Sequence, residues 1–403
     1  MKAFDRSGKS RLRLRLALLA LAALLIHPSA AGAVSEAQIR KRRAIDGELD
    51  LGDWSPTRDG PIALGGEWAF FPGALLSFDA ANEEDSPSFR SVPDQWKDSE
   101  AGGSGGMGAG TYKLTILLPE GASSLAIRYT TLSTAFELDA GGITIARAGR
   151  PAADRTLARA AYAPGVAAIP ADAARPVAGG LRLDLVLRAS NHEYRIGGMW
   201  RSFVIGDADA LEAARDARLN RSFVLSSALG AIVLVFLFFF KNRKNDGSFF
   251  FFSMFALSVS FRVLVTGEYA LAHLFPDLPF ELLIRFEYLT AFLPLPLAML
   301  FYASIFPNEI GGKLKLALLA PNVPFLVVVP FAPLPFLTRT IHPYYAVALP
   351  LIVATLILGP LRACVRKRYG GVPIAAGSII LGASVINDIL FSSFIVHTDI
   401  LFP

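Results

Sequence analysis

The chain has 403 residues, of which 53% are hydrophobic and 18% charged, and its mean hydropathy of +0.45 is too high for an ordinary soluble protein. The net charge of +5 would suit a nucleic-acid-binding protein, but the basic residues gather at the N-terminus and in short loops between apolar segments, where membrane topology and anionic lipid explain them better. The single cysteine, Cys364, excludes a disulfide framework or a cysteine-based metal site within one chain.

Residues 1–33 have the pattern of a secretory signal peptide. A basic stretch precedes the apolar core Leu16–Ile26, which is too short to span a bilayer, and Ala31-Gly32-Ala33 fits an A-x-A cleavage site. We expect the following residues to be exported, with an uncleaved anchor as the alternative. The basic run Arg40–Arg43 argues against easy export, because basic residues beside a membrane segment tend to stay in the cytoplasm.

Residues 45–206 predict an extracytoplasmic β domain. Short stretches that alternate apolar and polar residues are separated by Gly, Pro, Asp and Ser, which is typical of an antiparallel sandwich or jelly roll. Leu181–Leu187 is the clearest alternating strand. Ser124–Tyr129 follows Thr111–Leu118 at the spacing of a hairpin, and Gly141-Gly142 predicts the turn of another.

Two tryptophans of this domain, Trp68 and Trp96, have two interpretations. Large aromatic side chains dominate core burial, which favours the core for both. The alternative is an aromatic binding face, and on that interpretation these two are our candidate ligand-binding residues.

Sequence patterns of catalysis, cofactor binding and metal binding are not found. The glycine-rich stretch Gly102–Gly110 leads into a strand and lacks the Gly-Lys-Ser/Thr of a phosphate loop, so we interpret it as a flexible surface loop. His192 and His273 are isolated from other ligand-type residues, which makes a packed or surface histidine the default. We therefore expect no cofactor, no metal and no catalytic residue.

Residues 207–218 predict a juxtamembrane helix. Acidic residues come early and arginines late, as the helix dipole favours, and the segment runs without Pro or Gly into the first apolar stretch. A continuous helix would link the β domain stiffly to the membrane, whereas the alternative is a solvated stalk.

Residues 219–403 predict an all-α membrane domain. A helix needs about 20 apolar residues to cross a bilayer, and backbone polar groups inside lipid must be satisfied within the helix. Six such stretches occur: Leu219–Phe240, Phe249–Thr266, Leu282–Phe306, Leu314–Pro333, Tyr344–Cys364 and Val372–Val396.

The loops between these stretches predict the orientation. Basic residues fall in every second loop, in the ranges 241–244, 313–315 and 362–368, so these loops are assigned to the cytoplasm and the β domain to the outside.

The chain resembles a known family, the bacterial seven-transmembrane receptors with diverse intracellular signalling modules (7TMR-DISM), over about residues 50–403. The membrane half carries Lys244–Phe251, Phe261-Arg262, Thr266–Tyr269, Arg285–Thr290, Leu300-Phe301, Phe306-Pro307 and Asn387-Asp388. The β domain is similar to that family's jelly-roll sensor and to the sugar-binding domain of β-galactosidases, through Leu64–Phe70, Val92-Pro93 with Trp96, and Gly110–Leu114.

The resemblance implies a sensory receptor in a bacterial inner membrane, with its sensor in the periplasm or outside the cell. Its expected partners are the lipid bilayer, a small-molecule ligand with carbohydrate as the candidate class, and a second copy of the chain in a homodimer.

Two features depart from the family. Asp139–Gly142 stands where the jelly roll usually has an Asn-Gly turn, and the family's seventh helix and cytoplasmic effector are not in this sequence, so we expect a fragment or a shortened member.

Ionisable residues inside apolar helices are costly and point to function. At 1.5 Å of rise per residue, Arg262 lies roughly 20 Å from the cytoplasmic side, and the other polar residues fall at similar depth. We predict an intramembrane polar cluster, either a structural set of ion pairs or a pocket on which the β domain or a ligand presses. Its members are Arg262, Glu268, Arg285, Glu287, Asn387 and Asp388.

Two other functions are alternatives to a receptor. A transporter or channel with an accessory outer domain would use prolines such as Pro324 and Pro350 to break helices, but the sequence shows no clear internal repeat and the charges lie off the bilayer centre. An intramembrane enzyme would need paired catalytic groups, and Glu287 and Asp388 specify no reaction. We therefore expect a receptor and not an enzyme.

Overall fold

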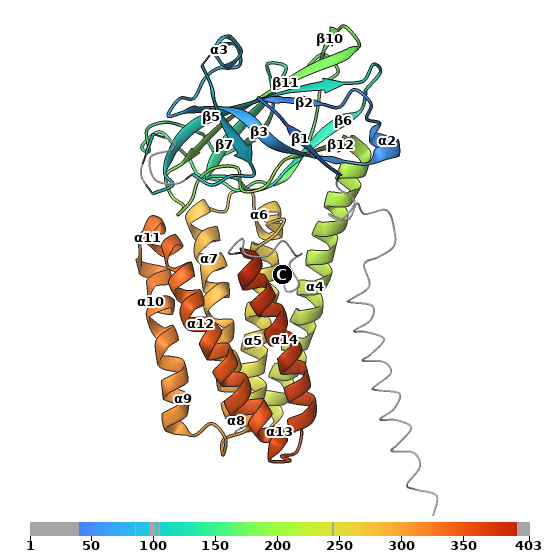
Figure 1. The fold of residues 1–403 in the computed structure, drawn as a ribbon. Helices are drawn as coiled ribbons and strands as arrows, with labels where there is room; N and C mark the ends of the chain where they lie inside the picture. The colour runs from blue at the N-terminus through green and yellow to red at the C-terminus, as the bar shows by residue number, and fades with distance from the viewer. Residues whose placement is uncertain (1–39, 85, 97–101, 104, 244–245, 393–403) are drawn as a thin grey trace, which may run out of the picture.

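A β domain stands on one end of a helical bundle, and one long helix joins the two (Figure 1). The predicted division into a β-sandwich followed by membrane-type helices is confirmed. The predicted signal peptide, residues 1–33, lies outside the described residues. The computed structural model describes residues 40–84, 86–96, 102–103, 105–243 and 246–392.

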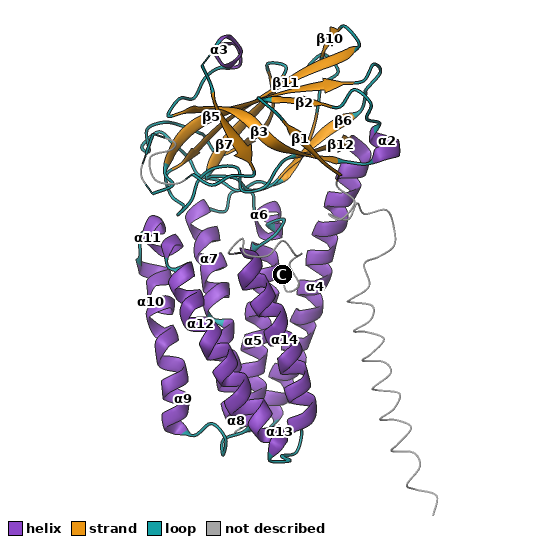
Figure 2. Ribbon diagram, viewed as in Figure 1, coloured by secondary structure: helices purple, strands orange, loops and turns teal. Residues whose placement is uncertain are grey.

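The β domain contains twelve strands in one hydrogen-bonded network, among the residues described (Figure 2). Its main path runs in the order β8-β7-β11-β5-β3-β12-β6-β9, with the other four strands paired at its sides. Two pairs, β1 with β3 and β2 with β5, are parallel, and the rest are antiparallel. The strands are β1 Arg40–Ala44, β2 Glu48–Asp50, β3 Ile62–Pro72, β4 Ser88–Val92, β5 Gly108–Leu118, β6 Leu125–Tyr129, β7 Ala135–Ala140, β8 Ile143–Ala148, β9 Gly165–Ala168, β10 Arg175–Val177, β11 Gly180–Asn191 and β12 Val204–Asp207.

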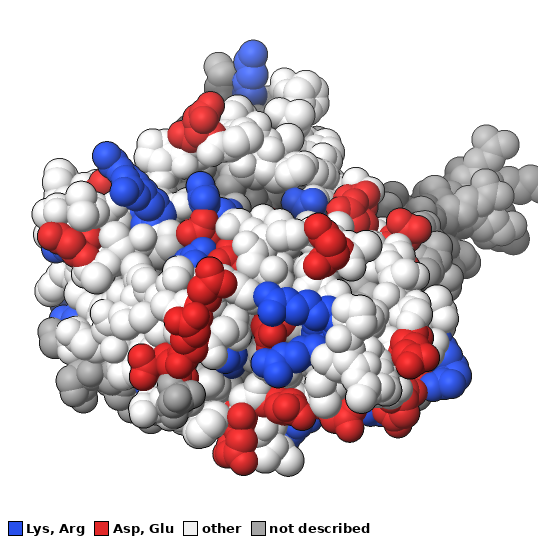
Figure 3. Space-filling view, turned by 90° about the horizontal axis from the view of Figure 1, so that it is seen from above, with Lys and Arg blue, Asp and Glu red and all other residues white. Residues whose placement is uncertain are grey.

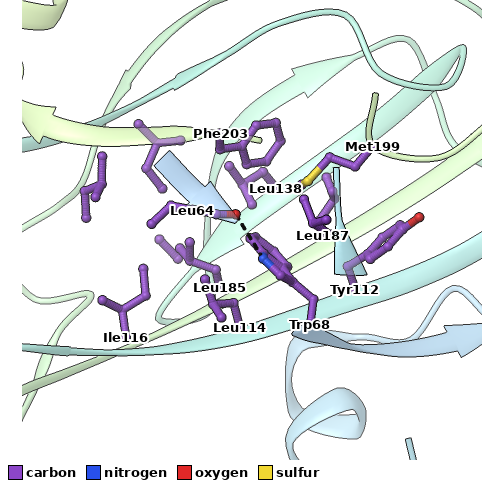
Figure 4. Packing of buried hydrophobic residues seen from close by; sticks show 14 of the residues in the cluster. Leu64, Trp68, Tyr112, Leu114, Ile116, Leu138, Leu185, Leu187, Met199 and Phe203 are labelled. Carbon is purple, nitrogen blue, oxygen red and sulfur yellow. Dashed lines mark hydrogen bonds between the residues drawn. The ribbon is translucent and has the colours of Figure 1, made fainter. Parts of the chain in front are cut away.

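Alternation along the strands builds the sandwich core, the cluster of buried side chains enclosed by the β domain. Leu183, Leu185 and Leu187 of β11 point inward and are fully buried, because successive side chains of a strand face opposite sides of the sheet. Around them lie further apolar residues from other strands and from the loop before β12 (Figure 4). Those labelled are Leu64, Trp68, Tyr112, Leu114, Ile116, Leu138, Met199 and Phe203.

Long-range pairing differs from one sequence prediction. β7 and β8 form a hairpin around Gly141-Gly142, as the sequence indicates. The predicted hairpin between Thr111–Leu118 and Ser124–Tyr129 is wrong, because β5 pairs with β11, β3 and β2 while β6 pairs with β12 and β9. Close spacing in the sequence is compatible with a hairpin but does not require one; here the chain crosses to the other part of the sandwich.

Two segments that the sequence pattern does not assign to strands contribute to the sheet. The basic run Arg40–Arg43 is part of β1, and Arg42 forms a 2.6 Å ion pair with Asp53. The glycine-rich stretch was interpreted as a flexible surface loop, but its last residues start β5 and Gly106 is buried. A Cβ at Gly106 would come within 2.9 Å of the Arg195 carbonyl oxygen, and its φ of +79° also favours glycine.

Five helices of the described residues are long and apolar enough to cross a membrane: Ala208–Asn242, Gly247–Val265, Phe280–Ile305, Gly312–Phe331 and Ile341–Val365, and Gly371–Asn387 is a shorter apolar helix. Several of the spans are built from more than one element, because prolines begin or interrupt them. The elements are α4 Ala208–Asn242, α5 Gly247–Val265, α6 Ala270–Leu274, α7 Phe280–Phe292, α8 Pro294–Ile305, α9 Gly312–Leu319, η2 Ala320–Asn322, α10 Val323–Phe331, α11 Leu334–Arg339, α12 Ile341–Leu356, η3 Ile357–Leu361, α13 Arg362–Val365 and α14 Gly371–Ser392. Two short helices, α2 Pro56–Asp59 and α3 Phe78–Glu83, belong to the β domain.

Helix α4 covers both the predicted juxtamembrane segment and the first membrane segment without a break. Asp207 caps it, accepting a hydrogen bond from the Ala210 amide at 3.0 Å. In its first turns, Leu211 packs with Ala126 and Val204 on the sandwich. The last residue of β12 is therefore the cap of the helix that enters the bundle, which leaves little slack between the two parts.

Candidate functional site

Side chains from the β domain and the bundle share one buried cluster where the two parts meet. We call this cluster, with its members from both parts, the junction cluster. The β domain contributes Tyr162, Tyr194 and Trp200. From the bundle the cluster includes Val265, Tyr269, Leu271, Phe280, Leu283, Ile284, Tyr288, Phe292, Leu337, Ile341 and Tyr344.

Tyr162 is the deepest contact from the β domain. Its ring lies edge-on to Tyr269, with centroids 5.2 Å apart, and to Phe280, with centroids 4.9 Å apart. It also meets Trp200 at 6.3 Å, and Trp200 meets Tyr194 at 5.3 Å. Edge-to-face pairs of this kind are favourable beyond their apolar area. A chain of aromatic rings therefore runs from the sandwich into the top of the bundle.

Hydroxyl groups and one carboxylate lie among these rings. The Tyr269 hydroxyl donates to Glu287 Oε2 at 3.3 Å, and Arg262 Nη1 donates to the Glu287 carbonyl oxygen at 3.5 Å. The Tyr288 hydroxyl donates to the Thr338 carbonyl oxygen at 2.9 Å and lies 3.5 Å from the Tyr194 hydroxyl. The junction cluster is thus a polar network inside an apolar contact.

Hydrogen bonds between side chains and the backbone hold the β-domain loop that carries Tyr194 and Trp200. The Asn191 side chain donates to the Gly106 carbonyl at 2.7 Å and to the Tyr194 carbonyl at 2.8 Å. The Met199 amide donates to Asp94 Oδ1 at 2.8 Å. These contacts connect the loop to the glycine-rich stretch and to the sandwich, so a shift of the β domain would move the aromatic rings.

Burial changes the acidity of the β-domain tyrosines at the junction. Removal from water raises the pKa of Tyr194 to about 12, and the nearby Glu287 carboxylate adds to the effect. Burial also raises the pKa of Tyr162 well above its usual value. Both hydroxyls are therefore neutral at physiological pH and available as hydrogen-bond donors.

Charged contacts surround the junction cluster at the level where the two parts meet. Arg195 Nη1 of the β domain donates to His342 Nε2 of α12 at 2.7 Å. On the bundle, Arg218 of α4 forms a 2.5 Å ion pair with Glu268, in the turn that follows α5. The first contact spans the two parts of the molecule, and the second ties α4 to the turn that leads to Tyr269.

The structure places Trp68 and Trp96, the candidate ligand-binding residues, in the sandwich core. They are 0% and 1% exposed, and neither indole offers a face to a ligand from solvent. Trp68 Nε1 donates to the Leu64 carbonyl at 3.1 Å (Figure 4), and Trp96 Nε1 donates to the Tyr112 hydroxyl at 2.6 Å. Their packing matches the core interpretation.

The structure describes contacts for four residues of the predicted intramembrane cluster. Arg262 of α5 donates to the backbone carbonyl of Glu287 on α7 at 3.5 Å, which is a hydrogen bond to the main chain and not the predicted pairing of opposite charges. Glu268 forms an ion pair with Arg218, which is not a member of the predicted cluster. Depth along a helix carries no information about which faces of the helices meet.

The remaining three residues take other positions. Arg285 pairs within its own helix with Glu281 at 2.5 Å and donates to the Ala332 carbonyl at 2.9 Å. Asn387 and Asp388 lie on α14, and the Asp388 side chain is outside what the structure describes. Among the described residues, no group of three His, Cys, Asp or Glu is placed to hold a metal ion.

Sequence reasoning missed the three β-domain aromatics of the junction. Tyr162 and Trp200 lie in irregular segments between strands, where no periodicity marks a buried face. A weak signal existed: several large aromatic residues stand in polar, glycine-rich surroundings directly before the membrane helices. An aromatic side chain in such a segment needs a partner outside its own strand.

A second feature is a groove of about 160 Å³ on the β domain, lined by residues of β2, β3, β4 and β5 and of the segments beside them. Three of its side chains are acidic, Lys113 is basic, and Phe89 is 47% exposed. Across the top of the molecule, acidic and basic residues are interspersed (Figure 3). The polar and aromatic residues that line the groove are Asp46, Glu48, Phe71, Glu84, Phe89, Lys113 and Thr115.

Comparison with known families identifies the bundle. Residues 222–403 match the family described as 7TM diverse intracellular signalling. The membrane domain of this chain belongs to that family. This is a family of membrane sensory receptors, and the apolar helices make the chain a multi-pass membrane protein.

Comparison with solved structures finds likeness over 36% of the chain. One is a β-glucuronidase from Faecalibacterium prausnitzii, with 15% identity, a TM-score of 0.28 and 31% of that chain covered. Another is a β-glucuronidase from Ruminococcus gnavus, with 16% identity, a TM-score of 0.28 and 28% of that chain covered. The matched region thus spans less than a third of either enzyme. Comparison with curated protein sequences finds no match.

Proposed function

We propose that this protein is the input part of a membrane sensory receptor, in which the β domain binds a small extracytoplasmic ligand and the junction cluster passes the resulting change to the 7TM domain. The observation that carries the proposal is the packing of Tyr162, which is buried, and of Tyr194 and Trp200, which are partly buried, in the same cluster as bundle residues. A ligand shifts such a system only if it binds two arrangements of the parts with different affinity. The output would leave through an effector on the far side of a bacterial inner membrane, and the chain itself would perform no catalysis.

Carbohydrate is the proposed ligand class, and the groove on the sandwich is the proposed site. Its carboxylates can accept hydrogen bonds from sugar hydroxyls, and the exposed ring of Phe89 can pack against the apolar face of a sugar. Three carboxylates line the groove against one lysine, Lys113, so acidic residues outnumber basic ones there.

The test uses the full chain in lipid nanodiscs and a panel of neutral and amino sugars. Binding is measured by calorimetry, and transmission by hydrogen exchange of the bundle residues 306–311 and 362–371, far from the groove. We expect a sugar that binds to change exchange at those segments. Phe89→Ala should remove binding, whereas Tyr162→Ala should leave binding intact and abolish the distant change.

The two parts of the proposal fail separately. If no sugar of the panel binds, the ligand class is wrong while the receptor remains. If a sugar binds and the bundle exchange stays the same in the unmodified protein, transmission through the junction is wrong. If Tyr162→Ala leaves the distant change intact, the signal passes through α4 alone.

A further inference from the structure

A second charged cluster lies at the opposite end of the bundle from the β domain. Glu309, in the loop between α8 and α9, is buried, with its side chain 1% exposed. Its carboxylate accepts from Arg366 Nη1 at 2.6 Å and from Arg368 Nε at 3.1 Å, and Arg362 Nε lies 3.6 Å away. We call these four residues the arginine clamp.

The three arginines of the clamp carry more positive charge than Glu309 neutralises and more N–H donors than its carboxylate can accept. Three guanidinium groups face one carboxylate, which leaves a net charge of +2 at the cluster. Each guanidinium has five N–H donors, and Glu309 engages only a few of them. The side chains of Arg362, Arg366 and Arg368 remain 43%, 45% and 47% exposed. The remaining donors are therefore open to an anion from outside.

A tight turn between α13 and α14 fixes these arginines relative to one another. The Arg366 amide donates to the Arg362 carbonyl at 3.0 Å, and the Arg368 amide donates to the Ala363 carbonyl at 2.9 Å. Gly371 packs so closely on this turn that an added Cβ would come within 3.0 Å of the Ala363 backbone. The buried Glu309 then holds the guanidinium groups from the inner side, which makes the site pre-organised.

The neighbours of the arginine clamp place it at the depth of lipid headgroups. Val365 is 81% exposed and Val372 is 66% exposed, and both lie on the helix ends that bracket the turn. Tyr369, within the turn, is fully exposed, and tyrosine is typical of the membrane–water boundary. Exposed apolar side chains such as Val365 and Val372 are expected to contact lipid acyl chains. The guanidinium groups beside them then lie at the depth of the lipid phosphate groups.

We propose that the arginine clamp binds the phosphate group of an anionic phospholipid, of the phosphatidylglycerol type, in the leaflet at this end of the bundle. Guanidinium groups bind phosphate by paired hydrogen bonds, and basic pockets at helix ends suit lipid headgroups. Because Glu309 joins the α8–α9 loop to the α13–α14 turn, a bound lipid would hold these two loops together.

The test measures lipid binding to the full chain in neutral detergent by native mass spectrometry. Phosphatidylglycerol and phosphatidylcholine with the same acyl chains are compared, and we expect preference for the anionic lipid. Arg362→Gln should weaken that preference about fivefold, the equivalent of one basic contact near a membrane surface. Arg362 makes the longest contact to Glu309, so this variant should still fold.

Two further variants separate a built site from general surface charge. Lys313→Gln removes one exposed positive charge from the same end of the bundle, outside the arginine clamp, and is the matched control. We expect a clearly smaller loss than with Arg362→Gln, and equal losses would overturn the proposal. Arg366→Lys with Arg368→Lys keeps the charge but removes the paired donors, and should also weaken binding.

Inorganic phosphate distinguishes a lipid from a soluble anion. We expect millimolar phosphate to leave the bound phosphatidylglycerol in place, because the acyl chains add to the contact. Displacement of the lipid by phosphate would instead assign the site to a soluble phosphate compound and overturn the lipid assignment. Equal binding of phosphatidylcholine and phosphatidylglycerol to the unmodified chain would overturn it as well.

Discussion

The sandwich core and the junction cluster are both rich in buried aromatic side chains, but they differ in what those side chains hold together. In the sandwich core, Trp68 and Phe203 pack edge-on with centroids 6.5 Å apart, within one domain. In the junction cluster, Tyr162 meets Phe280 across two parts of the molecule. In the core, the Trp68 indole donates to the Leu64 carbonyl of its own domain, whereas in the junction cluster the Tyr194 hydroxyl of the β domain lies beside the Tyr288 hydroxyl of the bundle. A change in the core should therefore cost stability, and a change at the junction should alter coupling.

The largest effect is expected from Trp68→Ala. Truncating a fully buried tryptophan removes its apolar contacts and leaves a cavity, which destabilises a domain by about 3–5 kcal/mol. Denaturant unfolding of the β domain in the full chain, followed by circular dichroism, gives the change in free energy. Trp68→Phe keeps most of the ring and is the control, with a smaller loss. An unchanged midpoint for Trp68→Ala would show that this side chain does not support the sandwich core.

The next largest effect is a loss of folding stability at alkaline pH, caused by a tyrosine of the junction cluster. The pKa of Tyr194 is about 12 in the folded protein, above a value near 10 for an unfolded tyrosine. Its contribution to stability is complete below pH 10 and is lost as the pH rises towards 12, by at most about 1.4 kcal/mol per pH unit. The measurement is the free energy of unfolding between pH 9 and pH 12, with Tyr194→Phe as the comparison. Identical slopes for the two proteins would contradict the buried position of this hydroxyl.

A matched pair of hydroxyl deletions compares two tyrosines of the junction cluster. Tyr288→Phe removes the donor to the Thr338 carbonyl and should cost about 1 kcal/mol. The Tyr162 hydroxyl is buried with no hydrogen-bond partner among the described residues, so Tyr162→Phe should be neutral or stabilising. Thermal unfolding of both variants provides the test. A comparable loss for Tyr162→Phe would reveal a partner for that hydroxyl, such as a bound water or ligand.

The smallest effect is expected at the edge of the junction. Arg155 pairs with Glu193 at 3.1 Å, one residue before Tyr194, but the arginine side chain is 60% exposed. Exposed ion pairs contribute about 0–1 kcal/mol, so Arg155→Ala should lower the free energy of unfolding by less than about 1 kcal/mol. A larger loss in low salt would mean that this pair positions the aromatic loop.

Local patterns made part of this structure predictable. The β7–β8 hairpin follows from a Gly-Gly turn between two alternating stretches, and β11 follows from strict alternation over Leu181–Leu187. The pairing of β5 with β11 joins residues about 70 positions apart in the chain, as between Thr115 and Asp184, and no local pattern specifies such a partner. The site was predicted least well, because Tyr162, Tyr194 and Trp200 lie in segments without periodicity.

Length and apolarity alone predict which segments can cross a membrane. Five of the six predicted stretches lie in described helices that are long and apolar enough to do so, and the sixth begins in a shorter apolar helix. The sequence by itself also determined that ionisable residues occur within those helices. Only the tertiary structure decided their partners: Arg262 lies beside Glu287, Glu268 pairs with Arg218, and Arg285 pairs with Glu281. The physical reason is that sequence position gives the depth of a residue along a helix, while the partner depends on how each helix is rotated and packed against its neighbours. That packing is cooperative, and it also brings the aromatic loop of the β domain onto the bundle.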